Sequence, residues 1–276
     1  MRIVPARNGW QWLMTGLRLF GRSPLAWIAM VLFYWSLMML ANAVPWVGSI
    51  VGTVLLPVFS VSFMVMAREV EAGRRLVPPL LFAGFARNRR ELLILGALYL
   101  AALVATLVLS MLADGGALAR YMLFGDAPTA EEARSGAIAW AGMLAMLAYT
   151  PVLMAYWFAP VLAAWEDMSA AKSLFFSFFA TWRNWRAFLV YGAAVSLLAL
   201  PVLLFFLVIA GAVAGFGLDA DSPDQRRLAT GMLAGAPLFL ALAAVLIASF
   251  YASYRDIFPP PSGESAPPPP QPPSQS

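Results

Sequence analysis

Two arginine-rich segments carry the residues of this sequence that are best suited to binding chemistry. Guanidinium groups bind phosphate oxygens through a planar, forked set of donors, and tryptophan rings settle at the boundary between hydrocarbon and water. We therefore regard nine residues as candidate interfacial lipid contacts. The alternative is that they only anchor helices at the interface, for which the same residue types suffice. The nine residues are Arg87, Asn88, Arg89, Arg90, Trp182, Arg183, Asn184, Trp185 and Arg186.

Acidic residues form two clusters whose chemistry has to be considered. Asp114, Asp126, Glu131 and Glu132 could pair as acid and base, but their spacing does not require it. Asp219, Asp221 and Asp224 alternate loosely like calcium ligands, yet they lack the glycine and the distal glutamate of an EF-hand loop. Solvated loops explain both clusters better, so we predict no metal site here.

Cysteine and histidine are both absent from the chain. Thiolate nucleophiles, cysteine–histidine zinc sites, haem ligation by histidine and histidine acid–base catalysis are therefore excluded. We predict no catalytic residue and no cofactor, and we expect the protein not to be an enzyme.

Composition identifies the class of protein. Apolar residues make up 62% of the chain and charged residues 12%, against about 45–50% and about 25% in soluble domains. The charges are gathered between long uncharged runs, which is typical of a polytopic membrane protein. The net charge of +4 is then explained by topology and anionic lipid, and not by nucleic acid.

The apolar runs predict an all-α fold with six transmembrane helices. A run of 20 residues gives about 30 Å of helix, enough for one hydrocarbon crossing. Pro151 and Pro160 could each kink the fourth span. The predicted spans are Leu25–Val44, Trp46–Met66, Leu92–Ala113, Gly136–Trp165, Phe188–Phe216 and Met232–Phe250.

Short amphipathic segments precede these spans. The first follows a capping box of Asn8 and Gln11, the second covers Leu80–Ala86, and the third follows Ser169 as N-cap. In the first we expect one apolar face made of Trp10, Leu13, Met14, Leu17 and Phe20. Basic and aromatic residues beside a span predict helices that lie in the cytoplasmic interface.

The distribution of charge predicts the orientation. With both termini inside, the inner segments hold 14 of the 18 basic residues and seven acidic ones, a net charge of +7. The outer loops hold four basic and seven acidic residues, a net charge of −3. The positive-inside rule therefore favours cytoplasmic termini.

An internal repeat organises the chain. An offset of 96 residues aligns the segments 87–97 and 183–193, with six of 11 positions identical, including Arg-Asn and Gly-Ala. A fainter copy is Phe20-Gly21-Arg22-Ser23. We predict three parallel units, each an interfacial helix followed by a two-helix hairpin.

The segments VPARNGWQWL, LFFSFFATWRNWRAFLVYG and FYASYRDIF resemble a family of bacterial inner-membrane proteins of unknown function. The resemblance covers nearly all the chain except its end, and it implies a multi-pass protein of the inner (plasma) membrane. More distantly, the repeated hairpins are similar to the membrane domain that accompanies some glycerophosphodiester phosphodiesterases. This chain contains no soluble phosphodiesterase domain, so that activity does not carry over.

We therefore predict a six-helix transmembrane domain over residues 1–258 and a disordered, cytoplasmic tail over 259–276, where nine of 18 residues are proline. The tail is either a solvated spacer or a ligand for a partner domain. The expected function is a non-enzymatic envelope component that organises lipids or other membrane proteins. The alternative is a permease or channel for an apolar or amphiphilic solute.

Overall fold

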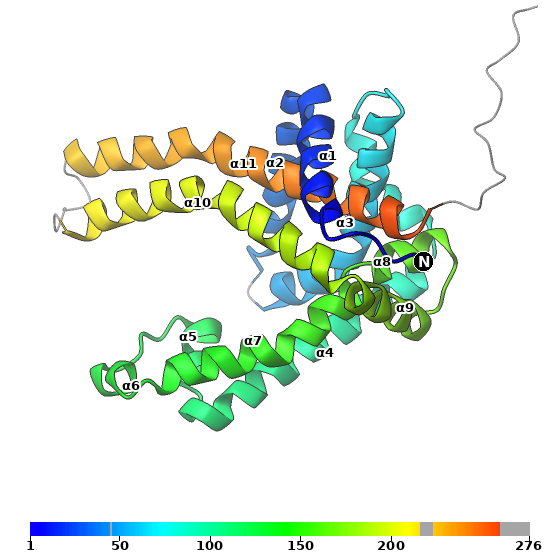
Figure 1. Ribbon diagram of the computed structural model, residues 1–276. Coiled ribbons are helices and arrows are strands. Elements are labelled where there is room, and N and C mark those ends of the chain that lie inside the picture. The colour runs from blue at the N-terminus through cyan, green and yellow to red at the C-terminus, as the bar shows by residue number, and fades with distance from the viewer. Residues whose placement is uncertain (45, 216–222, 260–276) are drawn as a thin grey trace, which may run out of the picture.

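The computed structural model describes residues 1–44, 46–215 and 223–259, and these residues form helices with no strand among them. Six stretches of the described chain are long and apolar enough to cross a membrane, which confirms the predicted all-α polytopic class. They pair as three consecutive hairpins (Figure 1). The spanning helices are α2 (Pro24–Ala41), α3 (Val47–Glu71), α4 (Arg89–Asp114), α7 (Ala137–Tyr156) continued by α8 (Ala159–Trp165), α10 (Trp185–Gly215) and α11 (Pro223–Ile257). The predicted tail, apart from Pro259, lies outside the described residues.

Each hairpin is preceded by a short helix, so the order of elements is the predicted one. The short helices are α1 (Asn8–Arg22), η1 (Pro78–Ala86) and α9 (Ala170–Arg183). The second is a 3-10 helix that starts with two prolines, which fit the first turn because they have no N–H to leave unsatisfied there. Two further helices, α5 (Ala117–Phe124) and α6 (Ala130–Arg134), lie in the loop between α4 and α7.

Two spans continue beyond their predicted limits into charged sequence. α3 continues past Met66 to Glu71, and α11 continues past Phe250 to Ile257. The prediction ended each span where charge began, but a helix can carry charged residues in its last turn. Here Glu71 pairs with Arg255 and Asp256 pairs with Arg2, while the backbone keeps its helical hydrogen bonds.

The fourth span is broken at Trp157 and Phe158, just before Pro160, whereas α7 runs through Pro151 without interruption. Pro160 has no N–H to donate to the carbonyl of Tyr156, four residues earlier, and its ring would collide with that carbonyl in a continuous helix. At the break, the N–H of Phe158 donates to the hydroxyl of Ser177 on α9 at 2.8 Å. The buried backbone therefore stays satisfied, and α8 can turn towards α9.

The three units close into a ring, because each short helix packs against the hairpin of the unit before it. η1 packs on α3, α9 packs on α7 and α8, and α1 packs on α10 and α11 of the third unit. Close approach depends on glycine: a Cβ at Gly84 would collide with the carbonyl of Val58, and one at Gly9 with the carbonyl of Ala187. The short helix of the first unit thus packs against the hairpin of the third unit, which closes the ring.

The face by which α1 packs overlaps the predicted one: Leu13 is buried and Met14, Leu17 and Phe20 are partly buried, but the centre of the face is shifted. The buried residues are Gly9, Trp12, Leu13, Gly16 and Leu19. The prediction considered only the large apolar residues. Gly9 and Gly16, two turns apart on one face of α1, have no side chain and so allow the backbones of α10 and α11 to approach the helix. Trp10, which was placed on the apolar face, is exposed instead.

The predicted capping box at the start of α1 is also wrong. Arg7 occupies the N-cap position and makes no side-chain cap. The amide of Asn8 instead donates to the carboxylate of Asp256 at 2.8 Å. The side chain of Asn8 therefore makes a tertiary contact with the end of α11 instead of the local cap that the sequence pattern predicted.

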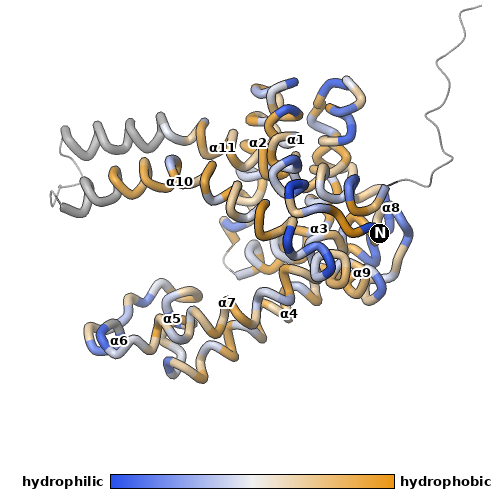
Figure 2. The backbone as a smooth tube through the Cα atoms, in the orientation of Figure 1, coloured by the Kyte–Doolittle hydropathy of each residue, from blue (hydrophilic) through white to orange (hydrophobic). Residues whose placement is uncertain are grey.

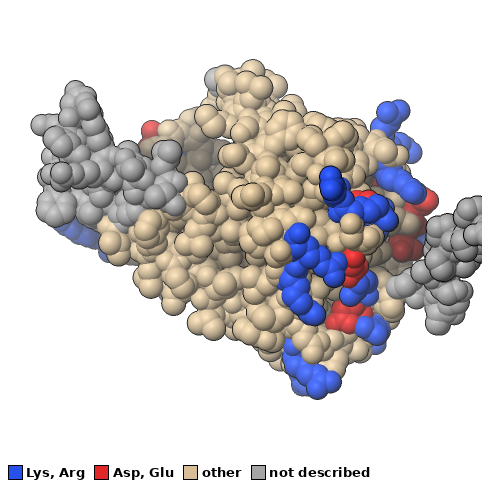
Figure 3. All heavy atoms as spheres, turned by 90° about the horizontal axis from the view of Figure 1, so that it is seen from above, with Lys and Arg blue, Asp and Glu red and all other residues tan. Residues whose placement is uncertain are grey.

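Charge and apolar surface are separated along the molecule. The spans are hydrophobic for most of their length (Figure 2), and large apolar side chains such as Leu25, Met39 and Leu112 face outward from them. In Figure 3 most of the visible Lys and Arg side chains gather at one end, and the wide surface beside it is almost free of charge. The hairpins α4–α7 and α10–α11 diverge from that end (Figure 1).

Candidate functional site

The first candidate segment is the turn between α9 and α10. Asn184 is only 2% exposed, and its Oδ1 accepts the N–H of Val4 at 2.8 Å. Its Nδ2 donates to the carbonyls of Ala180 at 2.8 Å and Arg2 at 3.2 Å. Asn184 therefore holds the backbone of this turn and does not belong to the surface.

The residues on either side of Asn184 face outward. Trp182 is 60% exposed and Trp185 is 52% exposed. Arg183 and Arg186 are also exposed, and the guanidinium of Arg186 lies 5.5 Å from the centre of the Trp185 ring. The turn thus presents two tryptophans and two arginines on a fixed backbone.

The second candidate segment, between η1 and α4, is built in the same way. Asn88 has a left-handed backbone with φ of 38°, and its Nδ2 donates to the carbonyls of Ala163 at 2.8 Å and Met168 at 3.4 Å. Three exposed arginines flank it; they are Arg87, Arg89 and Arg90. In both turns the repeated asparagine is structural and the arginines are at the surface.

In each unit, a side chain at the junction of the short helix and the first spanning helix binds backbone that lies near the end of the unit's second spanning helix. Asn88 and Asn184 do this in the second and third units. Asn88 reaches the end of α8 and the segment after it, and in the first unit Arg22 donates to the carbonyls of Val70 and Glu71 at the end of α3. In the third unit the corresponding segment is supplied by the N-terminus. The N–H of Arg2 donates to the carbonyl of Ile257 at 2.9 Å, so residues 2–4 continue in space where α11 ends.

Three carboxylates at the same end support this arrangement. Glu91 accepts the N–H of Ala170 at 2.8 Å, which caps α9; Ser169 is the N-cap residue as predicted but makes no side-chain cap. Asp256 accepts the indole N–H of Trp12 at 2.8 Å and pairs with Arg2. Glu71 accepts the hydroxyl of Tyr251 at 2.7 Å and pairs with Arg255. The sequence signal was the position of these acids beside the spans, but their partners are distant in the chain.

An aromatic face of α9 adjoins the first turn. Phe175, Phe179 and Trp182 are exposed, and Phe178 stacks on Trp182 with ring centres 6.2 Å apart. The opposite face is buried through small residues, among them Ser177 and Ala180. An apolar face beside arginines is the pattern of a helix that lies in a membrane interface.

Of the four acidic residues predicted as a cluster between α4 and α7, Asp114 and Glu132 have local structural partners, whereas Asp126 and Glu131 are exposed. Asp114 accepts the N–H groups of Gly116 at 2.8 Å and Leu118 at 2.6 Å. Glu132 forms a capping box with Thr129 at the start of α6. Hydrogen bonds from the backbone N–H and the hydroxyl of Thr129, with a further contribution from Arg120, lower the pKa of Glu132.

The described residues contain no group of three acidic side chains close enough to hold a metal ion. The other predicted acidic cluster, Asp219, Asp221 and Asp224, lies outside the described side chains.

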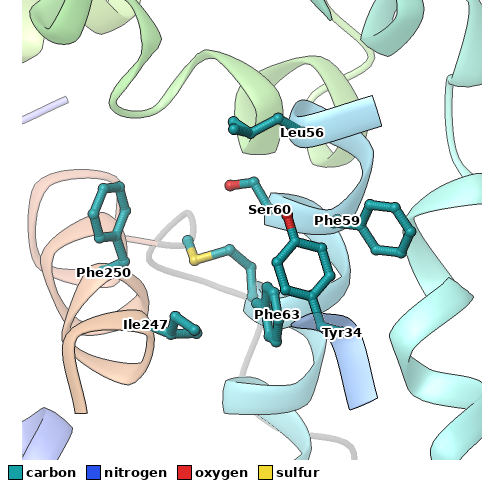
Figure 4. Close-up of a pocket in the computed structure, with 8 residues that line it drawn as sticks. Tyr34, Leu56, Phe59, Ser60, Phe63, Ile247 and Phe250 are labelled. Carbon is teal, nitrogen blue, oxygen red and sulfur yellow. The ribbon is translucent and has the colours of Figure 1, made fainter. Parts of the chain in front are cut away.

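A small apolar cavity of about 240 Å³ lies within the membrane-spanning region. It is a partly open hollow between α2, α3 and α11, and its lining includes Leu56, Phe59 and Phe250 (Figure 4). Ser60 and Tyr34 are its polar residues. A cavity of this kind suits an apolar group.

The helices, the outward apolar surface and the basic end define a polytopic membrane protein with an interfacial face. A probable inner membrane protein of Burkholderia thailandensis is 36% identical to the chain over 263 residues, which cover 92% of each protein. The chain belongs to the family of that protein, and it is an inner membrane protein. No family model matches the chain, and no solved structure matches it.

Proposed function

We propose that the protein is a non-enzymatic component of the inner membrane that organises anionic lipids around its basic end. The carrying observation is the pair of turns in which an inward-facing asparagine fixes the backbone while arginines face outward, joined in the turn between α9 and α10 by two tryptophans. Rigid backbone lowers the entropic cost of ordering a bound headgroup. Membrane proteins that bind the same lipids are further candidate partners.

The charges of the two turns support this proposal. Among the described residues, the only ion pair made by their five arginines is that of Arg90 with Glu91, at 3.9 Å. Arg87, Arg89, Arg183 and Arg186 therefore keep guanidinium groups for external acceptors. Phosphate oxygens at a membrane surface are such acceptors.

The proposed orientation has both termini in the cytoplasm. The excess of basic residues at the end where the N-terminus and the end of α11 meet supports it. In this orientation the tryptophans and the aromatic face of α9 lie at the cytoplasmic interface. The proline-rich tail would then leave on the cytoplasmic side, as a spacer or as a ligand for a partner domain.

Native mass spectrometry of protein extracted with its surrounding membrane patch tests the proposal. The variant combining R87Q, R89Q, R183Q and R186Q should retain less phosphatidylglycerol and cardiolipin than the wild type, with phosphatidylethanolamine unchanged. The control is R134Q, which removes one exposed positive charge from the loop at the other end. Equal retention of anionic lipid by the wild type and the fourfold variant would refute the proposal.

A permease or channel for an apolar or amphiphilic solute is the second candidate. The apolar cavity beside Tyr34 and Ser60 favours it (Figure 4). Solute uptake into vesicles with the protein, compared with matched empty vesicles, distinguishes the two candidates. An enzyme would be indicated by a reproducible turnover that is abolished when Glu131 or Glu132 is replaced by Gln.

A further inference from the structure

A cavity of about 750 Å³ lies at the basic end, where the last turns of α3, α8 and α11 converge. Arg68, Trp165 and Arg255 all line it. In the sequence each of them directly precedes a carboxylate, Glu69, Glu166 and Asp256 respectively. The three lining residues thus hold corresponding places in the three units, and this central cavity lies at the centre of the ring.

The wall of the central cavity combines a charged group with an apolar floor. Leu162, Met168, Phe176 and Phe258 supply apolar lining. The guanidinium of Arg68 lies 4.8 Å from the centre of the Trp165 ring, which fixes it at the wall. A volume of this size is in the range of sites for small organic ligands, roughly 300–1,000 Å³, and exceeds what a simple ion needs.

Most polar groups of the central cavity have a partner, although Glu166, which also lines it, accepts one hydrogen bond at 3.2 Å and makes no ion pair among the described residues. The hydroxyls of Tyr251 and Tyr254 donate to Glu71 and Glu166, and Arg255 pairs with Glu71. Among the described residues Arg68 has no carboxylate within ion-pair distance and no hydrogen-bond acceptor. The unused capacity of the cavity is therefore that of a guanidinium donor.

Arg68 also faces a second, smaller cavity. This hollow of about 260 Å³ shares Arg68 and Trp165 with the central cavity and adds Arg87 to the lining. An anion held by Arg68 would therefore have a second guanidinium, that of Arg87, close to its site. The local charge favours a phosphate over an amine.

We infer that the central cavity binds the phosphate of an amphiphilic ligand, with Arg68 as its donor and the aromatic floor against the adjoining apolar part. The inference rests on the proposed function, because it adds one defined binding site to the surface at which the arginines of the two turns are proposed to gather anionic lipids. The phosphate can come from a phospholipid headgroup or from a soluble phosphate ester. The geometry of the site is the same for both.

The test is native mass spectrometry of the full chain titrated with phosphatidylglycerol. The wild type should retain one lipid more tightly than the rest. R68Q should bind that lipid about tenfold or more weakly, which is the loss expected for one charge-assisted contact. The control is R18Q at the same end, whose guanidinium contacts only Met14 and Thr15 of its own helix.

The two sources of phosphate give different results. Displacement of the tight lipid by excess sn-glycerol 3-phosphate assigns the site to a soluble ester, and resistance to it assigns the site to a lipid. An unchanged tight lipid in R68Q would overturn the inference.

Photoactivatable phosphatidylglycerol in the wild-type protein supplies a measurement that needs no variant. Its labelling should map to the peptides that contain Trp165 and Tyr254, and labelling confined to other peptides would also overturn the inference. The variant combining R89Q, R183Q and R186Q, which leaves Arg87 in place, separates this outcome from the proposed function. If it keeps the tight lipid and loses the others, both stand; if it loses none, only the cavity stands.

Discussion

Replacement of Asn184 by Ala should release the N-terminal segment from the third unit. In the wild type the Asn184 amide makes three backbone hydrogen bonds, to the N–H of Val4 and the carbonyls of Arg2 and Ala180. The Val4 N–H is buried with its residue, which is 8% exposed. Leaving such a donor unsatisfied and losing the other bonds should cost about 2–4 kcal/mol.

Most of that cost should appear as local opening and not as unfolding of the spans. Residues 2–4 are held by Asn184, by the Arg2–Asp256 pair and by one bond to Ile257. When Asn184 is lost, the open population of this segment should rise by roughly 30- to 700-fold. The hydrophobic core beneath it should remain packed.

The chain contains no cysteine, so one engineered thiol reports this opening without background. A V4C protein should react slowly with a maleimide, and V4C/N184A should react faster by the factor given above. The matched control is N88A, which removes the corresponding asparagine of the second unit. An unchanged rate in V4C/N184A, or an equal increase in V4C/N88A, would refute the assignment of Asn184 as the tie that closes the ring.

Two further predictions concern the second unit. G96A should lower the melting temperature, because its Cβ would collide with the carbonyl of Val54 and such overpacking costs about 1–3 kcal/mol. The control is G192A, the corresponding change in the third unit, whose Cβ would meet open space and should leave the melting temperature unchanged. Equal melting temperatures for both variants would count against the packing of α4 on α3. The pKa of Glu132 is lower in the folded protein than in the unfolded chain, where it is about 4.3. The cap therefore stabilises α6 fully at pH values above about 4.3, and this stabilisation is lost as the pH falls through the pKa of the folded protein. An NMR titration should show this pKa rising in T129A, and a value unmoved by that substitution would contradict the capping box as its cause.

Sequence reasoning recovered what apolar runs and repeats determine. Six spans, three hairpins and the short helix before each follow from the length of the apolar runs and the 96-residue offset. The closure of the ring could not be predicted, because it depends on contacts between Asn184 and Arg2 and between Trp12 and Asp256, which are distant in the chain. Local patterns assigned Asn8 to a cap for the same reason.

The candidate lipid contacts were predicted from residue type, which only partly distinguishes the residues at the surface from those that face inward. Arginine and tryptophan have little reason to be buried at a membrane boundary, so the exposure of the arginines in both turns and of the tryptophans in one was predictable. Asparagine has a short amide that satisfies backbone groups equally well inside a turn. Only the fold shows that Asn88 and Asn184 face inward.

The repeat also explains why one of the three corresponding cavity positions is Trp165. Three arginines around one cavity would repel one another. With Trp165 in one place, Arg68 gains a ring to stack on and Arg255 keeps its partner Glu71. Among the described residues, Arg68 is then the arginine of these positions that has no carboxylate partner and remains available to the proposed anionic ligand.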